Sequence, residues 1–235
     1  MLLEFDKITA GYGSLMVLHD ISLNVSRGEI VCIIGPNGAG KSTVLKTVVG
    51  QIRPNAGAVR FEGKDITDVG IEEKGRRGLI FIPQGENIFP NLTVLENLEM
   101  AGLLLPDSQK LHGTIDKALD TFPLIKKMKM RAARELSGGQ RQILALCRIL
   151  ILQPQLALLD EPSLGLSPLV VDLIFKEIQR MNQDGISFLL VEQNARKGLS
   201  ISHRGYVLEL GQNRLTGAGK ELLNNPEVRR LYLGG

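Results

Sequence analysis

The chain has 235 residues, 43% of them hydrophobic and 23% charged, and its formal net charge is +3. This composition is ordinary for a folded globular protein of one large domain, or of one domain carrying a subdomain. It gives no support to a nucleic-acid partner, for which a clustered basic footprint is expected. No apolar run reaches the roughly 18 residues that cross a bilayer, and no secretory signal pattern opens the chain. If the protein works at a membrane, we therefore expect another protein to hold it there.

The first part of the chain is expected to form strands, a glycine-rich loop and a helix. Strands are predicted at 2–9 and at 21–25, where apolar and polar residues alternate. The segment Ile30–Ile34 is apolar throughout, as in a strand covered on both faces. After the loop, a helix is predicted from about 41 to 49, with Gly50 as its C-terminal cap. Two further strands are predicted at 58–61 and 79–82.

From about residue 93 to residue 152 the pattern becomes helical. Thr93 and Glu96 have the spacing of a capping box, and Ser137 can cap a long helix over 138–152. The remaining predicted elements are strands at 156–159, 188–191 and 206–210, and a helix that begins at Ser167-Pro168 and reaches Asn182. Together these elements predict an α/β core interrupted by a helical insert. The two cysteines, Cys32 and Cys147, lie in apolar runs and are expected to be buried free thiols of a reducing compartment.

The glycine-rich loop carries the clearest chemical signal. Its sequence, Gly35-Pro-Asn-Gly-Ala-Gly-Lys-Ser-Thr43, matches the phosphate-binding pattern G-x-x-x-x-G-K-[ST]. Glycines allow backbone N–H groups to surround phosphate oxygens, and the following helix adds its positive end. Lys41 is expected to contact the β- and γ-phosphates, and Ser42 to bind Mg²⁺. The predicted nucleotide-binding residues of this loop are Gly35, Pro36, Asn37, Gly38, Ala39, Gly40, Lys41, Ser42 and Thr43.

Two adjacent carboxylates end the predicted strand over 156–159. Asp160 at the carboxyl end of this strand is expected to hold Mg²⁺ through water, as in other phosphate-loop NTPases. Glu161 is then placed to accept a proton from a water molecule that attacks the γ-phosphate. These two residues predict hydrolysis of the bound nucleotide.

A second anion-binding helix start lies in the segment Leu136-Ser-Gly-Gly-Gln140. In this order, the phosphate loop, this segment and the Asp160-Glu161 pair resemble the ATP-binding subunit of ABC transporters over essentially the whole chain. The resemblance implies a phosphate-loop core with an N-terminal antiparallel β subdomain over 1–92 and 153–235. It also implies a helical subdomain over 93–152 that docks on a membrane partner, within one domain of residues 1–235.

The resemblance also implies roles for residues that would otherwise be read as surface polar groups. In that family ATP is held between two subunits, so one subunit's Ser137, Gly138, Gly139 and Gln140 would contact the nucleotide bound by the other. Tyr12 would stack on adenine beside Val17, and Gln84 would contact Mg²⁺ and the attacking water. The implied metal ligands are Ser42, Gln84 and Asp160.

Two departures from the usual family pattern point to one subgroup. Gln193 stands where most members carry a histidine, and Ser167 replaces the usual aspartate after Glu161. Both variants are similar to ATP-binding subunits of branched-chain amino-acid importers. So is the ending, from Asn225 to Gly234. Because glutamine can donate a hydrogen bond but stays neutral, we expect Gln193 to assist catalysis by Glu161 less strongly than a histidine would.

The resemblance implies ATP and Mg²⁺ as ligands and a second ATP-binding subunit as partner, in a homodimer or a heterodimer. It further implies two integral membrane permease subunits and, indirectly, a periplasmic or lipid-anchored substrate-binding protein. The expected location is the cytoplasmic face of the inner membrane, as a peripheral subunit. The alternatives are the ATPase of a urea or amide importer, that of a lipopolysaccharide exporter, and a soluble ABC protein of translation or DNA repair. The single phosphate loop, and the lack of sustained heptads, argue against the last.

Overall fold

The computed structural model describes residues 1–85, 88–104 and 111–233. Part of the predicted helical insert, 105–110, and the last residue of the C-terminal resemblance, Gly234, lie outside the described residues. In the described part of the chain, no helix has both the length and the apolar character that a membrane span requires.

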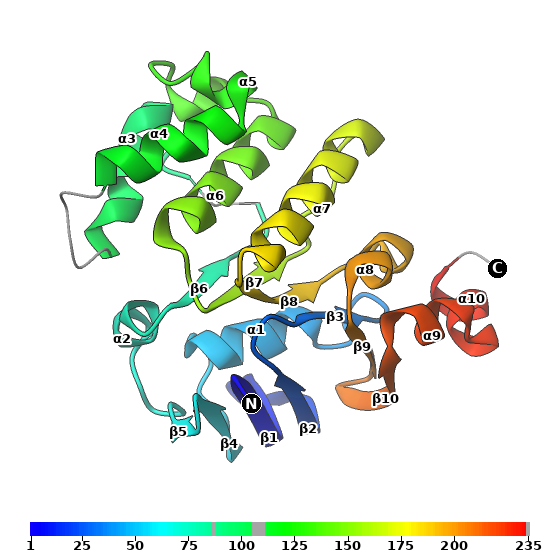
Figure 1. The fold of residues 1–235 in the computed structure, drawn as a ribbon. Coiled ribbons are helices and arrows are strands. Elements are labelled where there is room, and N and C mark those ends of the chain that lie inside the picture. The colour runs from blue at the N-terminus through cyan, green and yellow to red at the C-terminus, as the bar shows by residue number, and fades with distance from the viewer. Residues whose placement is uncertain (86–87, 105–110, 234–235) are drawn as a thin grey trace.

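A six-stranded sheet forms the centre of the molecule (Figure 1), in the order β10-β9-β3-β8-β7-β6. Its strands are β3 (Ile30–Ile34), β6 (Leu79–Ile82), β7 (Leu156–Asp160), β8 (Ser187–Val191), β9 (Arg204–Glu209) and β10 (Gln212–Ala218). All neighbouring strands are parallel except β9 and β10, which form a hairpin. The carboxyl ends of β3, β6, β7 and β8 therefore meet at one edge, where ligands of open α/β sheets bind.

A smaller antiparallel sheet contains the N-terminal strands, in the order β2-β1-β4-β5. Its strands are β1 (Leu3–Tyr12), β2 (Leu15–Val25), β4 (Ala56–Phe61) and β5 (Lys64–Asp65). The turn between β1 and β2 depends on a close backbone approach at Gly11, where a Cβ atom would lie 2.0 Å from the carbonyl oxygen of Leu15. This turn brings Tyr12 to the exposed end of the hairpin.

Helices cover both faces of the central sheet and form the insert. They are α1 (Lys41–Val49), α2 (Ile71–Arg76), α3 (Val94–Ala101), α4 (Leu111–Thr121), α5 (Pro123–Lys126), α6 (Gly138–Leu152), α7 (Pro168–Gln183), α8 (Ala195–Ile201), α9 (Gly219–Asn224) and α10 (Pro226–Tyr232). Short 3-10 turns occur at Gly102–Leu104 and Ala133–Glu135. The predicted capping box at Thr93 and the predicted helix cap at Ser137 are confirmed, and Ser137 also forms a capping box, with Gln140. The Thr93 hydroxyl accepts from the Glu96 amide at 3.1 Å, and the Ser137 hydroxyl accepts from the Gln140 amide at 3.4 Å.

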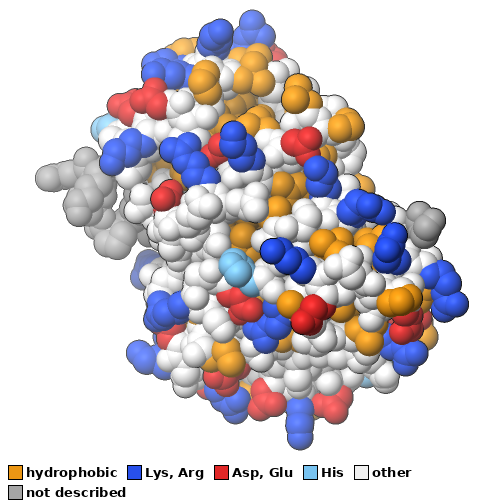
Figure 2. Space-filling view, turned by 45° about the vertical axis from the view of Figure 1, so that its right-hand side comes forward, with side chains coloured by type: hydrophobic (Ala, Val, Ile, Leu, Met, Phe, Trp, Pro, Cys, Tyr) orange, Lys and Arg blue, Asp and Glu red, His pale blue; other side chains and the backbone are white. Residues whose placement is uncertain are grey.

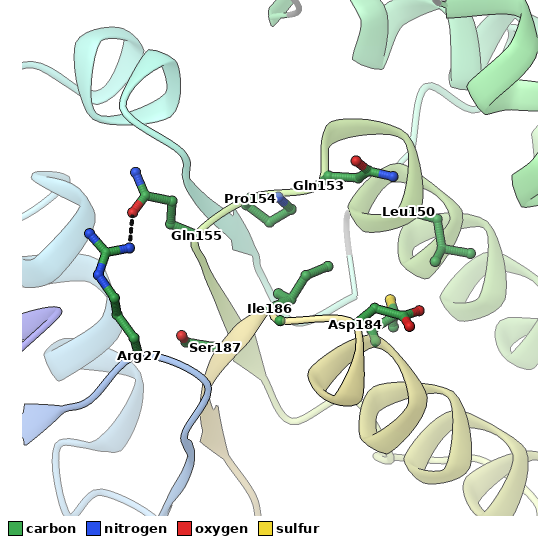
Figure 3. Close-up of a pocket in the computed structure, with 10 residues that line it drawn as sticks. Arg27, Leu150, Gln153, Pro154, Gln155, Asp184, Ile186 and Ser187 are labelled. Carbon is green, nitrogen blue, oxygen red and sulfur yellow. Dashed lines mark hydrogen bonds between the residues drawn. The ribbon is translucent and has the colours of Figure 1, made fainter.

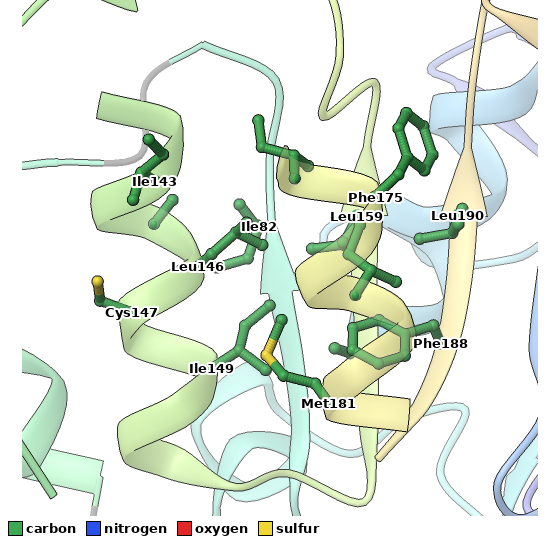
Figure 4. Close-up of a cluster of buried hydrophobic side chains, with 14 of the residues drawn as sticks. Ile82, Ile143, Leu146, Cys147, Ile149, Leu159, Phe175, Met181, Phe188 and Leu190 are labelled. Carbon is green, nitrogen blue, oxygen red and sulfur yellow. The ribbon is translucent and has the colours of Figure 1, made fainter. Parts of the chain in front are cut away.

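Two hydrophobic clusters sandwich the sheet, because its strands are buried on both faces. In β8, Phe188 and Leu190 belong to the cluster that includes α6 and α7, whereas Leu189 and Val191 belong to the cluster with α1 and the antiparallel sheet. Figure 4 shows the first cluster, in which α6 and α7 pack against the strands. Full burial of one such side chain contributes roughly 1.5–3 kcal/mol. The strands that carry the site are thus held rigidly from both sides.

The fold class predicted from the sequence is confirmed, and most predicted elements occur near their expected bounds. Gly50 caps α1 with a φ of 91°, and Cys32 and Cys147 are buried free thiols. The main differences are at the surface. Strand β2 begins at Leu15 instead of 21, and β9 ends one residue before Leu210. Strand β10 and helices α2, α8, α9 and α10 were not predicted, since they are short or largely exposed and carry little hydrophobic periodicity.

The face shown in Figure 2 carries basic and acidic side chains side by side, with apolar side chains between them. The basic side chains do not gather there into one continuous stripe. This face therefore carries no extended surface of one charge sign.

Candidate functional site

The phosphate loop connects β3 to α1 at the carboxyl edge of the sheet. Strand β3 is buried along its whole length, so the loop starts from a fixed point. Two glycines satisfy tight steric limits. A Cβ atom at Gly35 would lie 2.1 Å from the carbonyl oxygen of Leu208, and Gly40 precedes α1 with a φ of 97°. No side chain other than hydrogen fits the first position, so the pattern that predicted the loop is also required by its packing.

Lys41 bends back over this loop. Its ammonium group donates to the carbonyl oxygens of Gly35 at 3.0 Å and Pro36 at 3.1 Å, and the residue is only 5% exposed. A positive charge at the mouth of a glycine-rich turn, with the N-terminus of α1 beside it, favours the binding of anionic oxygens. The remaining loop residues flank Lys41 along the chain: Asn37 to Ala39 precede it, and Thr43 follows it.

Ser42 and Asp160 join the phosphate loop to the adjacent acidic strand end. The Ser42 hydroxyl donates to Asp160 Oδ1 at 2.8 Å, across 118 residues of chain. Asp160 ends β7 and is 4% exposed, and burial raises the pKa of its carboxyl while the Ser42 hydrogen bond lowers it. A hydroxyl and a carboxylate in contact offer the hard oxygen ligands that Mg²⁺ prefers.

Glu161 follows in a strained conformation beside Gln84. Its φ is +47°, which is uncommon for a residue other than glycine and typical of functional turns. Gln84, just after β6, donates from Nε2 to Glu161 Oε2 at 3.2 Å. Burial raises the pKa of Glu161, with Lys41 acting in the opposite direction. The structure thus brings Gln84 to the predicted general base, at the edge where Asp160 and the phosphate loop also lie.

Tyr12 and Val17 lie on the β1–β2 hairpin. Tyr12 is 49% exposed, and Lys46 Nζ on α1 lies 5.9 Å from its ring centroid. A Cβ atom at Gly40 would lie 3.4 Å from Val17 Cγ1, so Val17 borders the end of the phosphate loop. An exposed aromatic ring beside the loop offers a surface on which a base can stack.

The Ser137 turn belongs to a different part of the molecule. Ser137 and Gly138 are exposed at the start of α6, while Gly139 and Gln140 are half-buried. A Cβ atom at Gly139 would lie 3.1 Å from Val170 in α7. Among the described residues, no hydrogen bond connects Ser137–Gln140 to the phosphate loop of the same chain. The exposed part of this turn is formed by Ser137 and Gly138.

Gln193, the second residue after β8, is exposed and lines a cavity of about 360 Å³. The cavity walls come from the loop after Glu161 and from α8, including Ser163, Leu166 and Asn194. Glu192, which sequence reasoning passed over, lies beneath Gln193 and accepts from the Ser163 hydroxyl at 2.7 Å. The only sequence signal for this residue is an acid directly after an apolar strand.

Another cavity, of about 390 Å³, lies at the opposite edge of the sheet (Figure 3). It is lined by residues that precede or begin strands, such as Gln155 and Ser187, and Arg27 donates to Gln155 Oε1 at 2.7 Å. None of the residues predicted for the site lines this cavity. This cavity is thus separate from the predicted site.

Comparisons with known proteins agree with this geometry. Residues 18–164, more than half of the chain, match the family model described as ABC transporter. The chain is 42% identical to the high-affinity branched-chain amino acid transport ATP-binding protein BraG of Pseudomonas aeruginosa, over 100% of both chains. It is 37% identical to the probable branched-chain amino acid transport ATP-binding protein LivF of Archaeoglobus fulgidus, over 99% of both. The solved ADP conformation of MJ1267, an ATP-binding cassette of an ABC transporter, matches with a TM-score of 0.87 and 29% identity, over 100% of this chain and 99% of that one.

The burial of Glu192 predicts a pH-dependent stability. Burial raises the pKa of Glu192 from 4.5 to about 7, although hydrogen bonds from Ser163 and Asn194 lower it. The folded protein then holds this proton more tightly than the unfolded chain does. Protonated Glu192 therefore contributes to the free energy of unfolding below pH 4.5, and this contribution is lost as the pH rises to about 7. In urea unfolding without nucleotide or magnesium, the free energy of unfolding of the wild type should fall by about 3 kcal/mol more than that of Glu192→Gln over this pH range. An equal pH dependence of the free energy of unfolding in the two proteins would contradict a raised pKa of Glu192.

Proposed function

The chain belongs to the ABC transporter family as an ATP-binding subunit, and we propose that it pairs with a second such subunit to power an importer of branched-chain amino acids. ATPases of this family couple ATP hydrolysis to transport. The geometry that supports the proposal is the convergence of Lys41, Ser42, Asp160 and Glu161 at one sheet edge. The cargo is supported by the 42% identity to BraG over the full length of both chains. The lipopolysaccharide export protein LptB of Escherichia coli shares 34% identity, over 97% of this chain.

In the proposed site, the loop from Gly35 to Thr43 surrounds the triphosphate. The Lys41 ammonium exchanges its contacts with loop carbonyls for contacts with the β- and γ-phosphates, which are stronger because both partners are charged. Tyr12 stacks on adenine, with Val17 beside it. Stacking on the exposed Tyr12 ring does not select one base, because every base has a face that can stack.

Ser42, Asp160 and Gln84 would hold Mg²⁺. The residues fit this ion because the hydroxyl of Ser42 already contacts the carboxylate of Asp160, and both are oxygen donors. When bound, the ion neutralises charge on the phosphate oxygens. Asp160 is fixed at the end of a buried strand, so its carboxylate would hold a defined position opposite the positive charge of the ion.

Glu161 accepts the proton of the water that attacks the γ-phosphate. Gln84 donates to the Glu161 carboxylate and so orients it. Gln193 assists from the neighbouring loop by donating a hydrogen bond, without the positive charge that a histidine can carry. Slow hydrolysis by the isolated subunit remains a prediction.

The nucleotide site is completed by the partner subunit. Ser137, Gly138, Gly139 and Gln140 of one subunit contact the nucleotide bound by the other, through a helix start that favours anions. A solved dimer of the ATP-binding cassette MJ0796, bound to ADP and Pi, resembles this chain with a TM-score of 0.82 and 25% identity, over 92% of this chain and 98% of that one. The helical segment 93–152 docks on one of two membrane permease subunits. A substrate-binding protein delivers the transported substrate to these permeases. The subunit is then peripheral, at the cytoplasmic face of the inner membrane.

Replacing the general base should separate binding from hydrolysis. We expect Glu161→Gln to bind ATP normally, to lose about 100-fold or more in turnover, and to trap an ATP-bound dimer. Size-exclusion chromatography with ATP and a phosphate-release assay provide the measurements, on the chain alone and with its partner subunit. Turnover at the wild-type rate would show that Glu161 does not have this role.

The cargo is tested through the partners, because the ATP-binding subunit does not touch it. Affinity purification from solubilised membranes should recover two permease subunits and, with them, a binding protein whose ligand is leucine, isoleucine or valine. Calorimetry of that binding protein against these amino acids and against urea decides the cargo. Recovery of a urea binder, or of lipopolysaccharide export components, would overturn the importer assignment.

A further inference from the structure

Glu192 is a buried acid without a basic partner. It is 1% exposed, although it directly follows β8 and the next residue, Gln193, is exposed. In the described part of the chain, no lysine, arginine or histidine forms an ion pair with it. Buried acids are rare unless they are paired, because the charge loses its hydration. The contacts of this carboxyl group are instead with the loop that follows Glu161.

Both oxygens of the Glu192 carboxyl group bind this loop at Ser163. Oε1 accepts from the Ser163 amide at 3.1 Å, and Oε2 accepts from the Ser163 hydroxyl at 2.7 Å. Oε2 also receives the Asn194 amide at 3.4 Å. One carboxyl group thus links Ser163, in the loop after Glu161, to Asn194, in the loop that carries Gln193.

The backbone of Glu161 needs such support. Its φ of +47° is unfavourable for a residue other than glycine and persists only where neighbouring contacts impose it. The Glu161 amide donates to the carbonyl oxygen of Val191 at 2.8 Å, and its own carbonyl accepts from Leu164 at 3.1 Å. The Ser163–Glu192 contacts lie between these two bonds along the loop. Residues at the end of β8 therefore hold the turn of Glu161 on both sides.

The opposite side of the Glu192 side chain packs against α8. A Cβ atom at Gly198 would lie 3.2 Å from Glu192 Cβ, so the first turn of α8 approaches it closely. Asn194 starts this helix, with its Oδ1 accepting from the Lys197 amide at 3.1 Å. The loop that carries Gln193 is consequently fixed at its base, while the side chain of Gln193 remains exposed beside the 360 Å³ cavity.

We propose that Glu192 is a positioning residue for hydrolysis, because its carboxyl group holds the loop after Glu161 against the loop that carries Gln193. The proposal rests on the function proposed above, in which these two residues act on the γ-phosphate. Glu192 does not itself act as a base, since it is buried and both its oxygens are occupied.

The test is a double-mutant cycle between Glu192 and Ser163, measured as ATP turnover of the full chain in its membrane complex. A displacement of about 1 Å can cost 10²-fold in rate, so we expect Glu192→Ala to lower kcat about 30-fold, and Ser163→Ala about 5-fold. Glu192→Gln keeps an acceptor and should lose only about 3-fold. KM and the Kd for ATP should stay within about twofold, because the phosphate loop is untouched. The double variant Glu192→Ala/Ser163→Ala should be no slower than Glu192→Ala alone.

Glu177→Gln is the matched control, since Glu177 is another buried acid, on α7, and has no contact with Ser163. It should turn over ATP within about twofold of wild type. Losses that multiply in the double variant, or a folded Glu192→Ala with wild-type kcat, would overturn the proposal. If Glu192→Ala does not fold, Ser163→Ala decides, because a folded Ser163→Ala with wild-type kcat would overturn the proposal. Wild-type turnover in Glu161→Gln would refute the proposed function instead, so the two failures are distinguishable.

Discussion

The hydrogen bond between Ser42 and Asp160 joins the phosphate loop to the acidic end of β7. Ser42 lies in the first turn of α1, which follows β3, and Asp160 ends β7, two strands away in the sheet. The contact forms because all strands from β9 to β6 are parallel and their carboxyl ends share one edge. The buried sheet thus fixes where phosphate and metal ligands meet.

This constraint explains why the chemical residues lie on loops and the hydrophobic residues on strands. The two hydrophobic clusters hold β3, β7 and β8 from both faces, so that each loop departs from a fixed point. Glu161 keeps a positive φ of +47°, which the contacts around it can sustain. The Ser137 turn lies outside this arrangement, which agrees with a site completed by a second subunit.

The sequence predicted the central fold well because its strands are continuous apolar runs and its loops contain motifs with strict spacing. Ile30–Ile34, the capping box at Thr93 and the helix cap at Ser137 are examples. Strand β10 was missed because most of its side chains are exposed. Glu192 was missed for another reason. Its role depends on Ser163, which is 29 residues away in the sequence, and a single chain does not reveal such a pairing.

Whether Lys41 and the loop amides hold the triphosphate is measured by the affinity of Lys41→Ala for ATP. Calorimetry should show a loss of about 100-fold in affinity, corresponding to about 3 kcal/mol for a charge-assisted contact. Lys127→Ala, which removes an exposed charge in the helical segment, should bind ATP as wild type does. Unchanged affinity and turnover in Lys41→Ala would contradict the account.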